Sequence, residues 1–76
     1  MRATLLKELC SVASEIAERP VVASEATEVV DLGLDSLAML ELIGTLERRR
    51  SIRINSDDLV GIETVAELLD LFERNA

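Results

Sequence analysis

The residues best suited to chemistry lie in one short segment, residues 31–37, which read DLGLDSL. Ser36 supplies a hydroxyl group, and Asp35 stands directly before it. A serine hydroxyl is a weak nucleophile unless a neighbouring base takes its proton. The chain has no histidine, and no lysine or arginine lies between Pro20 and Glu47. This chain therefore cannot form a Ser-His-Asp triad, a Cys-His dyad or an imidazole metal site, and any reaction at Ser36 must be catalysed by another protein.

The same segment also has a purely structural explanation. Asp35 or Ser36 can be the N-cap of a helix that follows, because a short polar side chain at that position accepts hydrogen bonds from free backbone N–H groups. Gly33 permits a tight turn just before it. Leu37 falls on the same side of that helix as Glu41, so it is predicted to be an exposed leucine beside Ser36. From these residues alone, a helix cap and a modification site both remain open.

Three long helices and one short helix are predicted to position this segment. Apolar spacing at three and four residues predicts helices over 2–18, 36–50 and 64–74, and an N-cap followed by acids predicts a one-turn helix near 56–61. Pro20 disfavours helical geometry in the residue before it, which ends the first helix. Thr64 and Glu67 have the spacing of a capping box. No strand is indicated, so we expect an all-α fold, a small bundle with a long loop between the first two long helices.

The apolar residues of these segments are the predicted core. They are Leu5, Leu9, Val12 and Ile16 in the first helix, Met39, Leu42, Ile43 and Leu46 in the second, and Val65, Leu68, Leu69 and Phe72 in the last. In the loop, Val21, Val22, Val29, Val30, Leu32 and Leu34 could pin the chain to the core. Arg50 falls in the apolar arc of the second helix, and its stem is expected to lie along that arc with the charge in water.

Length and composition narrow the class of protein. Seventy-six residues with 49% hydrophobic content suffice for one compact domain over residues 1–76. Eight basic and fifteen acidic residues give a net charge of −7, which argues against nucleic-acid and membrane-surface binding. Cys10 is the single cysteine, so no internal disulfide or cysteine-rich zinc site is expected. No apolar run reaches the roughly 20 residues of a membrane span, and charges interrupt the first residues, so we expect a cytoplasmic protein. Without histidine and with one cysteine, we expect it to bind no metal.

One stretch of the chain is acidic without interruption. Between Pro20 and Glu47 its charged residues are Glu25, Glu28, Asp31, Asp35, Glu41 and Glu47. A face of one sign suits basic patches on partner proteins, because complementary charges steer their encounter.

Residues 31–37, continued by Glu41-Leu42 and Leu46-Glu47, resemble the phosphopantetheine attachment segment of the acyl carrier protein family. Downstream, Ile54, Asp57-Asp58 and Thr64-Val65 match the family pattern at the expected distances, so the resemblance covers nearly the whole chain. It implies a non-enzymatic four-helix carrier. By this resemblance, a phosphopantetheinyl transferase is expected to move 4'-phosphopantetheine from coenzyme A to Ser36, and the resulting thiol is expected to hold acyl groups as thioesters.

The resemblance also implies partners and further site residues. The partners are the transferase and a ketosynthase, an acyltransferase or acyl-activating enzymes, with the carrier itself a monomer. Partner recognition falls to residues on or near the second helix, namely Asp31, Asp35, Leu37, Glu41 and Glu47. A possible acyl-chain pocket is lined by Leu42, Leu46, Leu59, Ile62 and Leu68.

The chain departs from the family pattern at two places. Asn55 stands where a proline is frequent, and Arg48-Arg49-Arg50 replaces what is commonly an acidic run ending in an aromatic residue. This reversal of charge favours a free-standing carrier of a polyketide or other natural-product pathway over housekeeping fatty-acid synthesis. One alternative is an aminoacyl or peptidyl carrier of a nonribosomal pathway, for which a second glycine is expected before the serine rather than Leu34-Asp35. Another is an unmodified helical interaction module in which Ser36 is only a cap.

Overall fold

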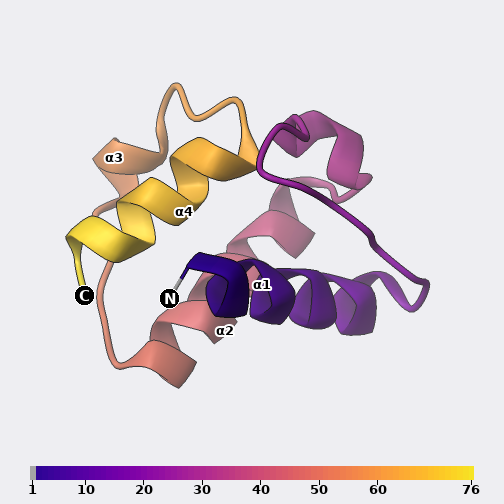
Figure 1. Ribbon diagram of the computed structural model, residues 1–76, viewed down its shortest axis with the longest axis horizontal. Helices are drawn as coiled ribbons and strands as arrows, with labels where there is room; N and C mark the ends of the chain where they lie inside the picture. Colours follow the sequence, from indigo (N-terminus) through magenta and orange to yellow (C-terminus); the bar gives the residue numbers. More distant parts are fainter. Residues whose placement is uncertain (1) are drawn as a thin grey trace.

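The computed structural model describes residues 2–76 as helices joined by irregular segments (Figure 1). Three longer helices form its frame: α1 (Arg2–Ala17), α2 (Ser36–Arg50) and α4 (Val65–Arg74). Two single-turn elements lie between them, the 3-10 helix η1 (Val29–Leu32) and α3 (Ser56–Leu59). Within residues 2–76 no strand forms, and one isolated antiparallel bridge joins Glu28 to Thr64. The expected helical class with three long helices is confirmed. None of the helices in the described part of the chain is long and apolar enough to cross a membrane.

Local signals set the helix ends. α1 stops at Ala17, one residue earlier than predicted, because Glu18 adopts the left-handed region with φ 57°. The predicted capping box at α4 is present: the Thr64 side chain accepts from the Glu67 N–H, and the Glu67 carboxylate accepts from the Thr64 N–H. Hydrogen bonds from the N–H groups of Glu63 and Thr64 hold the pKa of Glu67 below its ordinary value, because they stabilise the charged carboxylate.

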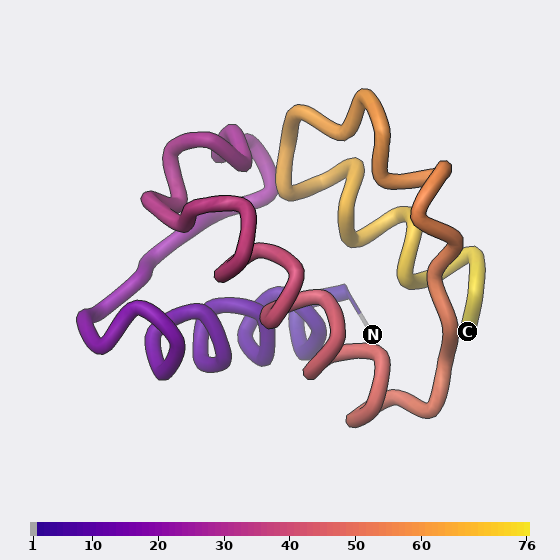
Figure 2. Tube along the Cα trace, turned by 180° about the vertical axis from the view of Figure 1, so that it is seen from behind, coloured from indigo at the N-terminus to yellow at the C-terminus, as the bar shows by residue number. Residues whose placement is uncertain are grey.

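The core lies where the three longer helices meet. In Figure 2, α2 runs diagonally across α1, and α4 lies to the upper right of α2. The buried apolar residues are Leu5, Leu9, Val12 and Ala13 in α1, Leu42, Ile43 and Leu46 in α2, and Val65, Leu68, Leu69, Leu71 and Phe72 in α4, joined by Val21, Leu32 and Ile54 from the connecting segments. Ile16 and Met39, predicted as core residues, are only partly buried.

The long loop between α1 and α2 is held by apolar anchors and by backbone hydrogen bonds. Val21 and Leu32 are buried as expected, whereas Val22 and Val30 are exposed, so the prediction that these two pin the loop is wrong. Three backbone hydrogen bonds attach the loop to the start of α4: Val29 N to Glu63 O at 2.8 Å, Val65 N to Thr27 O at 2.9 Å and Ala66 N to Glu25 O at 2.9 Å. These bonds hold the loop in place although its sequence has no helical periodicity, and they position η1 beside α4 (Figure 1).

Arg2 joins the first helix to the last. Its Nη1 donates to Asp70 Oδ1 at 2.6 Å and to Glu73 Oε1 at 2.7 Å, and its Nε donates to Glu25 Oε1 at 3.1 Å. The Asp70 carboxylate is the main cause that raises the pKa of Arg2 above its ordinary value. The ion pairs hold the beginning of α1 against α4 and the loop.

Candidate functional site

Asp35 is the N-cap of α2, and Ser36 is the first helical residue. Asp35 is extended, with φ −77° and ψ 178°, and its Oδ1 accepts a hydrogen bond of 2.8 Å from the Ala38 N–H. Asp35 O accepts from the Met39 N–H at 2.9 Å, the first bond of the helical ladder. The capping role that the sequence left open between two residues therefore falls to Asp35.

The Ser36 hydroxyl has no structural task within residues 2–76. The residue is exposed, and its Oγ makes no hydrogen bond to the described part of the chain. A helix cap would hold the hydroxyl against backbone N–H groups. Ser36 instead presents a hydroxyl that an external enzyme can reach.

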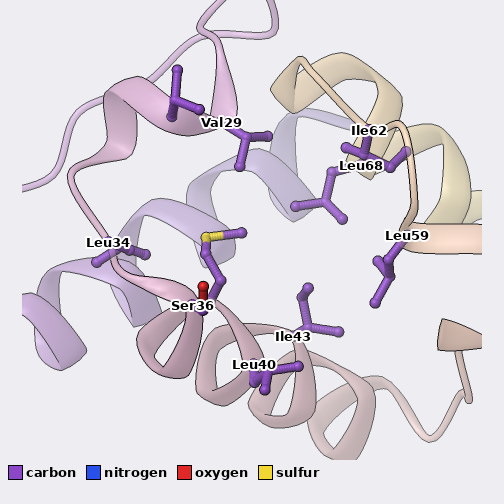
Figure 3. A pocket seen from close by; sticks show the side chains of 10 residues that line it. Val29, Leu34, Ser36, Leu40, Ile43, Leu59, Ile62 and Leu68 are labelled. Carbon is purple, nitrogen blue, oxygen red and sulfur yellow. The ribbon is translucent and has the colours of Figure 1, made fainter.

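Ser36 lies at an apolar cavity of about 410 Å³ (Figure 3). The cavity opens to the surface between η1, α2, α3 and α4, and apart from Ser36 its lining side chains are all apolar. They are Val29, Val30, Leu34, Met39, Leu40, Ile43, Leu59, Ile62 and Leu68. A hydroxyl at an apolar hollow of this size provides an attachment point with a neighbouring space for a hydrocarbon group.

The cavity includes three of the five predicted acyl-pocket residues. Leu59, Ile62 and Leu68 line it, whereas Leu42 and Leu46 do not. Successive helix residues are rotated by about 100°, so Ser36, Leu40 and Ile43 share one side of α2. Leu42 and Leu46 are turned away from that side and are fully buried in the core. Besides Ser36, the α2 residues that border this cavity are Met39, Leu40 and Ile43.

Exposed apolar side chains surround the serine. Leu37 is 75% exposed, as the sequence predicted, and Leu40 is 63% exposed although it lines the cavity. Val30, also in the cavity wall, is 80% exposed. A cluster of exposed apolar side chains marks a surface that a partner can cover. Val29 and Val30 were not predicted as site residues, and their place between Glu28 and Asp31 was the available signal.

The predicted recognition acids divide into two groups. Asp31 and Glu41 are exposed and form no ion pair within residues 2–76. Glu47 is half-buried, and its Oε2 accepts a hydrogen bond of 2.7 Å from the Ile54 N–H, so it holds the segment after α2. Asp31, Asp35 and Leu37 are near Ser36 in the sequence, and all three are exposed. Glu47 instead stabilises the segment after α2.

The basic residues Arg48, Arg49 and Arg50 at the end of α2 each interact with another side chain of this protein. Arg50 Nε donates to Glu8 Oε1 at 2.8 Å, and Arg49 Nη1 lies 3.8 Å from Glu8 Oε2. Arg48 Nη2 donates to Thr45 Oγ1 at 3.3 Å on the same helix. The expectation that the Arg50 charge reaches water past the helix end is thus corrected, because the charge is paired with α1.

Comparison with known proteins places these features in a family context. The family model described as "Phosphopantetheine attachment site" matches residues 7–72. The chain is 34% identical over 58 residues to an acyl carrier protein of Syntrophobacter fumaroxidans, covering 76% of this chain and 72% of that one. It is 31% identical over 70 residues to an acyl carrier protein of Brachyspira hyodysenteriae, covering 92% and 90%. It is 40% identical over 50 residues to an acyl carrier protein of Saccharopolyspora erythraea, covering 66% and 53%.

A solved structure has the same fold. The crystal structure of an acyl carrier protein from Thermotoga maritima superposes with a TM-score of 0.86 at 24% sequence identity, covering 97% of this chain and 88% of that one.

Proposed function

Because this chain belongs to the acyl carrier protein family, we propose that Ser36 is the residue that carries its phosphopantetheine group. Members of this family are carriers rather than enzymes, and they hold phosphopantetheine covalently. Once attached, the group supplies a thiol that binds acyl groups as thioesters. The proposal concerns which residue of this chain takes the group and which partners then use it.

The free Ser36 hydroxyl is the observation that carries this proposal. Asp35 caps α2, so Ser36 is exposed and its hydroxyl is not engaged by the fold. The residue also opens on the apolar cavity.

In the attachment step, Ser36 acts as the nucleophile and the transferase supplies the catalysis. Ser36 Oγ attacks the phosphorus of coenzyme A that bears the pantetheine arm, and a base of the transferase takes the hydroxyl proton. A phosphodiester bond forms at Ser36 while the pyrophosphate bond of coenzyme A breaks, which releases adenosine 3',5'-bisphosphate. The exposed acids Asp31 and Glu41 would attract a basic transferase surface, and Leu37 would give it an apolar contact.

The acyl chain is proposed to use the cavity beside Ser36. Met39, Ile43 and Ile62 offer apolar walls that a hydrocarbon chain can cover, which removes apolar surface from water. Relative to the form with a free thiol, the acyl-loaded carrier is expected to show altered methyl NMR signals for these residues.

The basic run supports a dedicated biosynthetic pathway. We propose polyketide or other natural-product synthesis, with a ketosynthase, an acyltransferase or acyl-activating enzymes as partners. Arg48 is exposed near the end of α2 and belongs to the run Arg48-Arg49-Arg50, which stands where fatty-acid carriers commonly have an acidic run. Transfer of an acyl group between the modified protein and a polyketide-type or a fatty-acid-type ketosynthase distinguishes the two pathways.

Incubation with coenzyme A, magnesium and a broad-specificity phosphopantetheinyl transferase, followed by intact mass measurement, tests the carrier function. A mass increase by one phosphopantetheine group supports it. An unchanged mass, under conditions that convert a control carrier, favours the helical interaction module.

A further inference from the structure

Arg19 links the end of α1 to the segment that precedes Ser36. Its Nη2 donates to Leu32 O at 3.1 Å and to Gly33 O at 3.2 Å. Leu32 ends η1, and Gly33 is its C-cap. The carbonyl groups at the end of a helix have no hydrogen-bond donor from a following turn. A charged donor is a strong partner for such carbonyls.

The backbone around Arg19 is itself held in place. The Arg19 N–H donates to Ser14 O at 3.3 Å, and the Val21 N–H donates to Ser14 Oγ at 2.8 Å. Pro20 fixes the backbone between these two anchors, and the Val21 side chain is buried. The guanidinium therefore extends from a rigid base toward Gly33.

Gly33 is the residue that allows the guanidinium to approach. Its φ of 74° lies in the left-handed region, and a Cβ built on it would stand 2.2 Å from Arg19 Nη2. Glycine thus satisfies two requirements at once, the backbone turn and the close contact. Two residues later, Asp35 caps α2 and fixes Ser36 as its first residue.

We infer that Arg19 is a positioning residue for the modification of Ser36, because it clamps the Leu32 and Gly33 carbonyls and so fixes the turn that leads into α2. This inference rests on the proposed function of Ser36. A transferase binds only those molecules in which this turn is formed, so loosening it lowers the apparent affinity in proportion to the competent fraction. The chemical step, once the complex has formed, is unchanged.

The test compares Arg19→Gln with Arg48→Gln, which removes the same charge from an exposed arginine whose hydrogen bond lies within α2. In Arg19→Gln we expect the transferase's KM for this protein to rise about fivefold, while kcat for phosphopantetheine transfer stays within about twofold of the wild-type value. Amide exchange of Ala38 and Met39, which bond to Asp35, should accelerate in the same variant. Arg19→Lys keeps the positive charge and one donor nitrogen but loses the planar guanidinium, so it should show smaller changes in both measurements than Arg19→Gln. Arg48→Gln should show neither.

The outcomes separate positioning from charge and from direct contact. If Arg19→Gln acted only by removing a positive charge, a basic transferase would bind the variant more tightly and KM would fall. A lowered KM would therefore overturn the inference. A change in only one of the two measurements would also overturn it, since direct contact would raise KM without altering amide exchange. An unmodified wild type would refute the proposed function instead, and the exchange of Ala38 and Met39 would still report whether the clamp exists.

Discussion

Glu8 in α1 and Arg50 at the end of α2 are joined by a hydrogen bond of 2.8 Å between Glu8 Oε1 and Arg50 Nε. The pair is partly shielded, with side-chain exposures of 24% for Glu8 and 30% for Arg50. Arg50 also borders a small hollow together with Leu5, Phe72, Glu73 and Ala76, and its charge is paired with Glu8. The pair holds the far end of α2 against α1.

We therefore expect Arg50→Phe to leave the melting temperature unchanged or to lower it, although the substitution adds apolar surface. Loss of the pair leaves Glu8 with Arg49 alone at 3.8 Å, and a partly exposed pair of this kind is worth roughly 0.5–1 kcal/mol. A thermal double-mutant cycle with Glu8→Gln and Arg50→Gln measures the coupling directly. A cycle in which the two effects simply add would refute it, and a raised melting temperature in Arg50→Phe would favour packing alone.

The two α2 acids Glu41 and Glu47 should respond differently to replacement by glutamine. Glu41 is exposed, so Glu41→Gln should slow the modification of Ser36 and leave the free energy of unfolding unchanged. Glu47 accepts from the Ile54 N–H, so Glu47→Gln should lower that free energy by roughly 1 kcal/mol. Urea unfolding and transfer kinetics on both variants check the contrast. Equal effects on stability would contradict the different tasks assigned to them.

Acid should weaken the α4 capping box through Glu67. Its pKa in the folded chain is lowered by the N–H groups of Glu63 and Thr64, so the carboxylate stabilises the fold above its ordinary pKa of 4.5. That contribution is lost as the pH falls through the lowered folded pKa. Between about pH 6 and pH 3, unfolding of the wild type should therefore depend on pH more steeply than that of Glu67→Gln. Glu63→Gln, which keeps the donating backbone N–H, is the control and should retain the wild-type slope.

Alanine at Gly33 should destabilise the fold more than alanine at Gly61. Both glycines have positive φ, 74° and 86°, but a Cβ at Gly61 meets nothing within 4 Å. Gly61→Ala should cost about 1 kcal/mol for the backbone alone. Gly33→Ala also displaces the Arg19 guanidinium and should cost about 2 kcal/mol in chemical unfolding. Equal costs would show that the Arg19 contact contributes nothing.

Sequence periodicity predicted the frame well because helices depend on local spacing and capping. The bounds of α2 were predicted as 36–50, and the capping box of Thr64 and Glu67 marked the start of α4. The exposure of Leu37 followed from its helical angle. These features involve residues within a turn or two of one another.

What the sequence did not reveal depends on distant partners. η1 has no period of its own and is held by Val29 N–H bonding to Glu63 O. The Arg50 pairing with Glu8 and the Arg19 bonds to Leu32 and Gly33 join residues far apart in the chain. Leu42 and Leu46 were expected in the pocket, but helical angle identifies only an apolar face and does not show which neighbouring element covers each part of it.

The most direct test of the account is to map phosphopantetheine transfer, comparing two serines that share a local setting. Ser36 follows the capping residue Asp35 at the start of α2, and Ser56 follows the capping residue Asn55 at the start of α3. Only Ser36 lines the apolar cavity. Intact mass and peptide mapping after reaction with coenzyme A and transferase should show one group on Ser36 in the wild type and in Ser56→Ala, and none in a folded Ser36→Ala. A group found on Ser56, or on Ser36→Ala at any position, would contradict the account.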